Sequence, residues 1–261
     1  MIAHKKRHPL VGSNLQDPYG GFPALIAILS IFFAGAAGDW ESVLSALMLT
    51  GVILLGIGMT LLTSKALSST VLKGIPSSFT LELPPYRRPQ VGQVLLRSIL
   101  DRTIFVLGRA AAVAAPAGLL IWVLANVTIG HQTLLGLCSG WLDPLGHFLG
   151  LDGAILVAFL LGLPANEIVL PILLMIYLST GSLTELGDLG VLHALLVQNG
   201  WTETTAVNFL LFSLLHWPCS TTCLTIHRET ASWGWTAVAF LLPTGVGMAC
   251  CALVNGLSHL L

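Results

Sequence analysis

The sequence predicts an all-α polytopic membrane protein with about six membrane-embedded helices, two of them broken or re-entrant. Its 261 residues are 55% hydrophobic and only 9% charged, whereas an ordinary soluble domain has about 25% charged residues. Several apolar windows are long enough to cross a bilayer core of about 30 Å. Two of these windows contain a proline-centred polar interruption. Together these observations exclude a soluble globular protein.

The candidate membrane segments follow from the apolar windows in chain order. The window 22–38 is short. The windows 43–63, 104–127, 153–178, 206–226 and 236–256 reach the length that a transmembrane helix needs.

Basic residues predict the orientation of these segments. Three of them, Lys5, Lys6 and Arg7, precede the first segment, and six more lie in the connection 64–103. The positive-inside rule therefore places 1–21 and 64–103 in the cytoplasm. Residues 128–152 contain no lysine or arginine, so we expect them on the outer side.

The second half of the cytoplasmic connection, VGQVLLRSILDR, alternates apolar and charged residues with helical spacing. This pattern predicts an amphipathic helix on the inner leaflet. A solvated linker between two spans is the simpler alternative. The net charge of −1 gives no indication of a nucleic-acid partner.

Five cysteines occur, and most of them lie inside apolar segments rather than in loops. A secreted disulfide framework is therefore not expected. These thiols either pack in the membrane core or act as ligands.

The two interrupted segments carry the strongest functional signal. The first break is GLPANE, residues 162–167, and the second is HWPCSTTC, residues 216–223. A broken helix frees backbone groups that hydrocarbon does not satisfy, so such breaks occur where protein or a water-filled cavity surrounds them. Paired breaks are typical of transport sites, whereas simple proline kinks are the structural alternative.

The residue types at the breaks predict a cation site. An unpaired Glu167 in a bilayer costs about 3 kcal/mol by insertion scales, and no lysine or arginine of a nearby span is available to pair with it. If the second break continues as a helix, His216, Cys219 and Cys223 lie on one face. Together with Asn166, this set suits a transition metal such as Fe(II) better than Na⁺, a sugar or a nucleoside. For Cys223 packing is the simpler role.

Long blocks of the sequence, among them ELPPYRRP, LGLDGAILVAFLLGLPANEIVLPILLM and LLFSLLHWPCSTTCLTIHRETASWGWT, are similar to the membrane half of the ferrous iron transport protein B family. The resemblance runs from about residue 22 to the C-terminus. It implies uptake of Fe(II) across the cytoplasmic (inner) membrane of a prokaryote by a multi-pass protein. Cys219 matches the cysteine of the family's second Gate motif, and Glu167 matches its carboxylate.

The resemblance also divides the chain. It implies a cytoplasmic N-terminal segment at 1–21, the end of the first Gate region with transmembrane helices at 22–63, a cytoplasmic loop with an amphipathic helix at 64–103, and a transmembrane domain with the second Gate motif at 104–261. Before residue 22 the family pattern leads us to expect a cysteine after a proline, and Tyr19 occupies that place.

The family's GTPase domain has no counterpart in these residues, because nothing matches G-x-x-x-x-G-K-[ST]. No other catalytic motif occurs, so we expect no enzyme activity and no bound cofactor, with Fe(II) as the transported substrate. The expected partners are Fe(II), the lipid bilayer, and either a separate GTPase-bearing chain or further copies of this chain, with no nucleic acid.

Two other functions stay open at this point. One is a non-transporting Gate-domain subunit or remnant that assembles with a partner, and the other is a Gate-type transporter of another solute such as a nucleoside. The topology also has alternatives, because 153–178 either crosses the bilayer or forms a re-entrant hairpin with Glu167 at its tip. We predict the hairpin, since it places the basic Arg228 inside.

Overall fold

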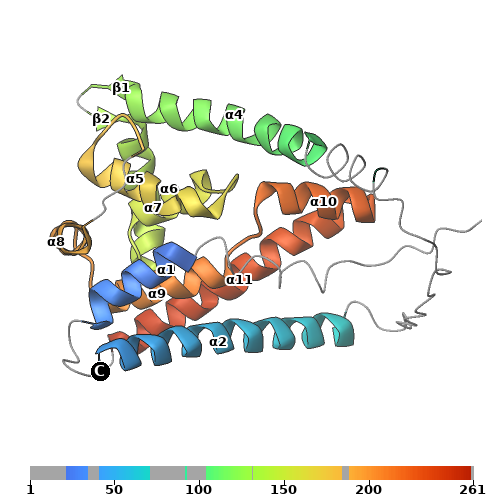
Figure 1. The fold of residues 1–261 in the computed structure, drawn as a ribbon, viewed down its shortest axis with the longest axis horizontal. Helices are drawn as coiled ribbons and strands as arrows, with labels where there is room; N and C mark the ends of the chain where they lie inside the picture. The colour runs from blue at the N-terminus through green and yellow to red at the C-terminus, as the bar shows by residue number, and fades with distance from the viewer. Residues whose placement is uncertain are drawn as a thin grey trace, which may run out of the picture.

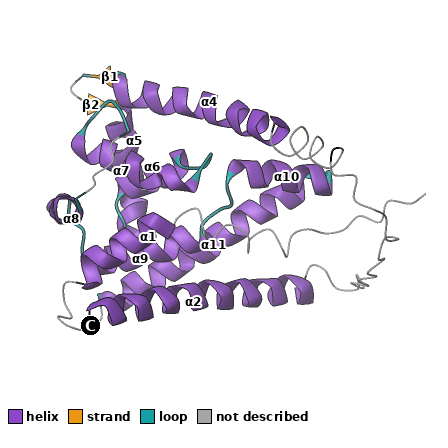
Figure 2. Cartoon of the chain, in the orientation of Figure 1, coloured by secondary structure: helices purple, strands orange, loops and turns teal. Residues whose placement is uncertain are grey.

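The computed structural model describes residues 22–34, 41–70, 92, 104–130, 132–183 and 188–259. These residues are almost entirely helical (Figure 1, Figure 2). The first part of the chain forms α1 Phe22–Leu29, the π-helix η3 Ser30–Ala34, α2 Glu41–Thr70 and α4 Phe105–Asn126. In Figure 1, α2 and α4 run along opposite sides of the molecule, with the remaining long helices between them. A helical membrane protein is therefore confirmed.

Helix α2 is longer than the apolar window predicts. The prediction placed the start of the cytoplasmic loop at residue 64, but the helix continues to Thr70. Residues such as Lys65, Ala66 and Leu67 favour helix, and 30 residues span about 45 Å, more than the bilayer core. The predicted segment 1–21 and the amphipathic helix at 91–102, apart from Gly92, lie outside the described residues.

The number of spans can be compared with the predicted six only for the described part of the chain. There, two helical stretches are long and apolar enough to cross a membrane, namely Glu203–Thr230 and Trp233–Ser258. The pair Leu134–Phe148 and Gly153–Leu161, bent by 110°, would form a third if it is one span. Shorter apolar stretches occur at Leu49–Thr63 and Ala110–Asn126, within α2 and α4.

The segment 128–152, for which we predicted an outer location, contains a helix that the apolar windows did not predict. Two-residue strands, β1 Thr128–Ile129 and β2 Gln132–Thr133, pair antiparallel and lead into α5 Leu134–Phe148. The Thr133 hydroxyl caps α5 by accepting a hydrogen bond from the Gly136 amide at 3.1 Å. Glycines and Pro144 keep this segment below the length and hydropathy of a span. Helix α8, Leu189–Gln198, lies in another segment without an apolar window of sufficient length.

Residues 153–178 fold as an antiparallel helical hairpin. It consists of α6 Gly153–Leu161, the short 3₁₀ helix η6 Asn166–Ile168 and α7 Val169–Leu178. The Tyr177 hydroxyl, at the end of α7, donates a hydrogen bond to Asp152 at the start of α6. Each arm is about 15 Å long, half of a bilayer core. The folded-back shape is confirmed, and re-entry into the membrane stays a prediction.

The second interrupted segment is also broken as predicted. Helix α9, Glu203–Leu215, ends before the WPC sequence, and α10, Ser220–Thr230, begins after it. The long α11, Trp233–Ser258, then returns along α9. The largest fully buried side chains belong mainly to α6, α7 and α9, and include Phe159, Leu173, Met175, Phe209 and Phe212. The core of the protein therefore lies between the hairpin and the second broken helix.

The C-terminal end of α5 packs tightly against α9 and α11. The Asn208 side-chain amide donates to the Leu149 carbonyl at 3.0 Å, and the Asn255 amide donates to the carbonyls of His147 and Phe148 at 3.1 and 3.2 Å. These bonds satisfy carbonyls that the helix end leaves free. Gly150 follows with a φ of +67°, the left-handed conformation that glycine adopts readily.

Replacing Gly150 with alanine is expected to destabilise the protein by about 3 kcal/mol, from left-handed strain and overpacking together. The new Cβ would lie 2.4 Å from Asn208 Nδ2 and 2.7 Å from Asn255 Oδ1. Gly200→Ala is the matched control, because Gly200 also has a positive φ, +86°, but has nothing within 4 Å. Thermal unfolding in detergent measures both variants, and equal losses would contradict the crowding at Gly150.

Candidate functional site

The two breaks lie against each other. Just after the end of α6, the carbonyl of Leu163 accepts a hydrogen bond of 2.9 Å from the backbone amide of Ser220. Ser220 is the first residue of α10, so its amide is one of those that a helix start leaves free. Figure 2 shows both breaks as loops between helices. A carbonyl freed by one break is thus satisfied by an amide freed by the other, as a non-aqueous environment requires.

Cys219 occupies the start of α10 beside this junction. Its backbone is extended, with φ −60° and ψ 158°, and its sulfur lies 3.1 Å from the hydroxyl oxygens of both Thr221 and Thr222. A helix N-terminus carries a partial positive charge that favours an anionic group. The sulfur of Cys219 therefore lies at the partly positive end of α10.

His216, Cys219 and Cys223 would share one helical face only if the helix continued through the second break, and this condition is not met. Residues 216–219 are not helical. His216 Nδ1 lies 2.8 Å from the Ser213 carbonyl oxygen, and the ring is only 8% exposed. The ring packs against Phe159 at a centroid distance of 5.1 Å. His216 thus belongs to an aromatic cluster in this conformation.

Cys223 does lie close to Cys219. It is one turn further along α10, and its amide donates to the Cys219 carbonyl at 3.0 Å. The Cys223 thiol donates weakly to the Pro218 carbonyl, at 3.6 Å. Cys223 also lines a recess of about 600 Å³ between α4, α10 and α11. Its neighbours there include Leu163 and Ser220, so this largely apolar recess reaches the junction of the two breaks.

Asn166 and Glu167 belong to η6, at the tip of the hairpin. The preceding Ala165 is extended, so the chain reverses direction before α7 begins. Asn166 Oδ1 is buried and has no hydrogen-bond partner among the residues that the structure describes, and the same is true of Ser220 Oγ. Glu167 is exposed. Within the described residues, the breaks therefore hold two buried oxygen atoms without hydrogen-bond partners and one carboxylate that the protein does not cover.

The five predicted ligands are not assembled into a complete metal centre in this conformation. Within the described ranges, no group of three or more histidine, cysteine, aspartate or glutamate side chains is placed to hold a metal ion. The arrangement instead provides one thiol, the oxygens of Asn166 and Ser220, and helix ends that meet at one point.

The backbone hydrogen bond between Leu163 and Ser220 was not predicted from the sequence. Ser220 follows proline and cysteine in a pattern that signals a helix start, which would have identified its free amide. Leu163 acts through its backbone carbonyl, and no side-chain pattern reports such a role.

The fold and the junction define a class of protein: a polytopic helical membrane protein in which two discontinuous helices meet, as in transporters. Residues 49–101 match the family model for the C terminus of ferrous iron transport protein B, and residues 107–233 match the Gate model, which is described as nucleoside recognition. No solved structure matches the chain.

Similar curated proteins come from bacteria and an archaeon. The Fe(2+) transporter FeoB of Staphylococcus aureus strain MSSA476 is 33% identical over 208 residues, which are 76% of this chain and 29% of the relative. FeoB of Methanocaldococcus jannaschii is 27% identical over 241 residues, 86% of this chain and 34% of the relative. FeoB of a Synechocystis species is 32% identical over 170 residues, 63% of this chain and 26% of the relative.

The chain belongs to the ferrous iron transport protein B family and corresponds to its C-terminal membrane half, as the sequence resemblance indicated. It spans about three tenths of the length of the curated relatives that it matches. Neither of the two matching family models is a GTPase model.

Proposed function

We propose that this chain forms the permease part of a ferrous iron transporter in the cytoplasmic membrane of a prokaryote, and that Fe(II) passes at the junction of the two breaks. The hydrogen bond between the Ser220 amide and the Leu163 carbonyl carries the proposal. It brings the tip of the hairpin, which carries Glu167, close to the start of α10, which follows Cys219. These two segments are about 50 residues apart in the sequence. The relatives named Fe(2+) transporter support the choice of ion.

The chemistry of the proposed passage follows from the donors. Exposed Glu167 attracts the hydrated cation, and Cys219 then replaces part of its water shell with sulfur, a ligand suited to transition metals. Asn166 Oδ1 and Ser220 Oγ supply neutral oxygens. The cation draws the hairpin tip and α10 together during passage, since transporters move such elements around a fixed site. Cys223 is the next sulfur along α10, and His216 contributes only in a state in which its ring leaves Phe159.

Energy for transport comes from outside these 261 residues in this proposal. The sequence has no phosphate-binding motif of the G-x-x-x-x-G-K-[ST] type. A GTPase-bearing chain, or a GTPase elsewhere in a longer polypeptide, supplies nucleotide hydrolysis, and further copies of the chain complete the assembly.

Anaerobic Fe(II) uptake into proteoliposomes tests the proposal. We expect wild-type protein to take up Fe(II), and we expect Glu167→Ala and Cys219→Ala each to lose most of that uptake, because each removes a charged or soft ligand. Glu203→Ala and Cys138→Ala are the matched controls. Glu203 lies at the other end of α9 and Cys138 lies exposed on α5, so both should retain uptake. Uptake that is unchanged in all four variants would remove the junction from the pathway.

A second candidate function is a non-transporting Gate-domain subunit. It is favoured by the lack of an assembled three-ligand group in the described ranges. Fe(II) binding without uptake by the wild-type protein, under conditions in which a full-length relative transports, would support it.

A third candidate is transport of a nucleoside, which the description of the Gate model raises. The same vesicles distinguish it, because radiolabelled uridine would then enter while Fe(II) does not.

A further inference from the structure

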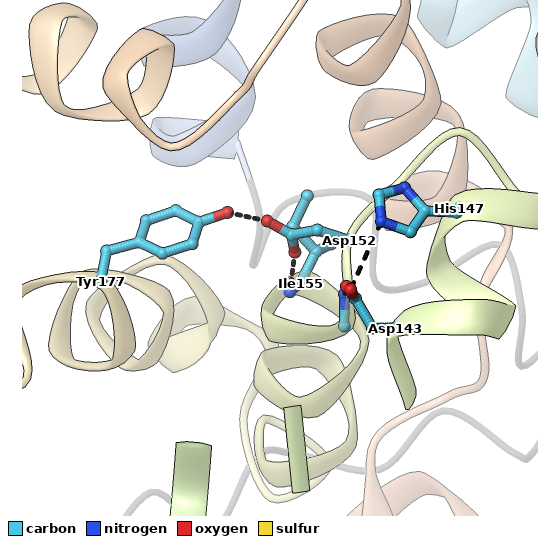
Figure 3. A network of polar contacts seen from close by, with 6 residues as sticks. Asp143, His147, Asp152, Ile155 and Tyr177 are labelled. Atoms are coloured by element: carbon cyan, nitrogen blue, oxygen red, sulfur yellow. Dashed lines mark hydrogen bonds and ion pairs between the residues drawn. The ribbon is translucent and has the colours of Figure 1, made fainter. Parts of the chain in front are cut away.

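The hairpin and the second broken helix are also joined at the ends remote from the breaks. The hydroxyl group of Tyr177, near the end of α7, donates a hydrogen bond to Asp152 Oδ2 (Figure 3). The same hydroxyl oxygen accepts a hydrogen bond of 2.8 Å from the indole Nε1 of Trp201, just before α9. One phenol therefore ties both arms of the hairpin to the start of α9.

Asp152 is fixed in this network from both sides. Its Oδ1 accepts a hydrogen bond of 2.6 Å from the Ile155 amide and so caps α6, while Oδ2 accepts from Tyr177 (Figure 3). The adjacent Gly153 amide donates to Asp143 Oδ1 at 3.0 Å. Since both carboxylate oxygens are engaged, Asp152 holds the Tyr177 hydroxyl at a defined position relative to α6.

An aromatic column runs from this network to the second break. Trp201 contacts Phe209 at a ring distance of 5.3 Å, Phe209 contacts Phe159 at 5.3 Å, and Phe159 contacts His216 at 5.1 Å. Along α9 this column covers about 20 Å. Trp201 is 4% exposed and Phe159 and Phe209 are each 1% exposed, so the column is a packed part of the core that transmits displacement rather than absorbing it.

We propose that Tyr177 is a positioning residue for the transport site. Its hydroxyl bonds set the position of the hairpin along α9, and that position decides whether Leu163 reaches Ser220 and how accessible Cys219 is. This inference rests on the proposed function, because it assigns the regulation of the same junction. Tyr177 lies at the opposite end of the hairpin from the junction and touches no cation.

The reactivity of Cys219 toward a membrane-permeant maleimide reports the position of the hairpin along α9. This measurement does not depend on transport. The measurement uses the full chain in proteoliposomes, with Cys138, Cys223, Cys250 and Cys251 replaced by alanine. Tyr177→Phe keeps the ring and removes the hydroxyl, and Trp201→Phe keeps an aromatic ring and removes the Nε1 donor. Thr244→Val is the matched control, because that hydroxyl donates a hydrogen bond of 2.6 Å within its own helix, to the Phe240 carbonyl, and has no other partner among the described residues.

We expect the Cys219 labelling rate to change by at least about five-fold in Tyr177→Phe, because the variant loses both hydrogen bonds of the hydroxyl, and one buried hydrogen bond alone corresponds to about that factor. Trp201→Phe should change the labelling rate in the same direction. The double variant should differ little from Tyr177→Phe alone, because both substitutions disrupt the same chain of hydrogen bonds from Asp152 through Tyr177 to Trp201. Thr244→Val should match the parent. Labelling in Tyr177→Phe that equals the control, with the protein folded, overturns the inference.

A second readout separates this inference from the proposed function. Fe(II) added anaerobically should slow the labelling of Cys219 in the parent protein if the thiol is a ligand. No protection by Fe(II), combined with altered labelling in Tyr177→Phe, would reject the proposed function and retain the positioning role. Protection by Fe(II) with unaltered labelling in Tyr177→Phe would do the reverse.

Discussion

Replacing Ser220 with proline is expected to reduce Fe(II) uptake by about tenfold or more, the factor that corresponds to 1.4 kcal/mol, while leaving the protein folded. Proline has no amide hydrogen, so the hydrogen bond to the Leu163 carbonyl is lost. The helix itself tolerates the change, because Ser220 is the first residue of α10, where proline is favoured. Cys219 already has the extended backbone that a residue before proline adopts, with ψ 158°.

The effect on uptake should be large, because the substitution separates the two breaks. An unpaired buried carbonyl costs about 1–3 kcal/mol, and the proline ring occupies the space between the two chains. We therefore expect uptake to fall by about tenfold or more, the factor that corresponds to 1.4 kcal/mol. The measurement is initial-rate Fe(II) uptake in proteoliposomes, with size-exclusion chromatography to confirm folding.

Ser220→Ala provides the control for this experiment. It keeps the amide and removes only the hydroxyl, whose oxygen is buried without a partner in the described part of the chain. Uptake should fall less in this variant than in Ser220→Pro, because it loses one neutral oxygen ligand but keeps the hydrogen bond to the Leu163 carbonyl. Near-normal uptake in Ser220→Pro would show that the junction between the breaks is not needed for transport.

The largest expected effect on stability comes from Gly153→Ala. A Cβ at this position would lie 2.0 Å from the Ser139 carbonyl oxygen and 2.8 Å from the Asp143 amide nitrogen. Both are backbone atoms of α5, so no side-chain rotation relieves the clash. Helices α5 and α6 must separate, and we expect a loss of at least about 3 kcal/mol, the upper part of the usual range for overpacking. Stabilities of native proteins are only about 5–15 kcal/mol.

Gly140→Ala is the control for this substitution, because it adds the same methyl group to α5 with nothing within 4 Å. Alanine also has the higher helix propensity, so this variant should be as stable as wild type. Tryptophan fluorescence during thermal unfolding in detergent measures all three proteins. A Gly153→Ala protein that unfolds at the wild-type temperature would contradict the close packing of α5 on α6.

The two breaks were predictable from sequence because their causes are local. Proline lacks an amide hydrogen and disfavours helix in the residue before it, so Pro164 and Pro218 interrupt their helices. The hairpin was predicted because it fits the charge bias around it better than a full crossing, since it places Arg228 inside. The resemblance to the family also rested on contiguous residues, and the comparisons confirm it.

The predictions were incomplete where a side chain's direction depends on more than its own neighbours in the chain. The shared face of His216, Cys219 and Cys223 assumed a continuous helix, but the extended break sends His216 into the aromatic cluster instead. Helix α5 was not predicted because its glycines and Pro144 weaken the apolar pattern of the segment. The stability of α5 comes instead from its packing on α6.

The sequence by itself determined that this protein lies in a membrane, where its helices break, and to which family it belongs, because composition, proline and contiguous motifs act over short stretches of chain. Only the tertiary structure decided that Leu163 meets Ser220 and that Tyr177 joins Asp152 to Trp201. Those contacts join residues 24 to 57 positions apart. Their geometry is set by how whole helices pack, and no local pattern encodes it.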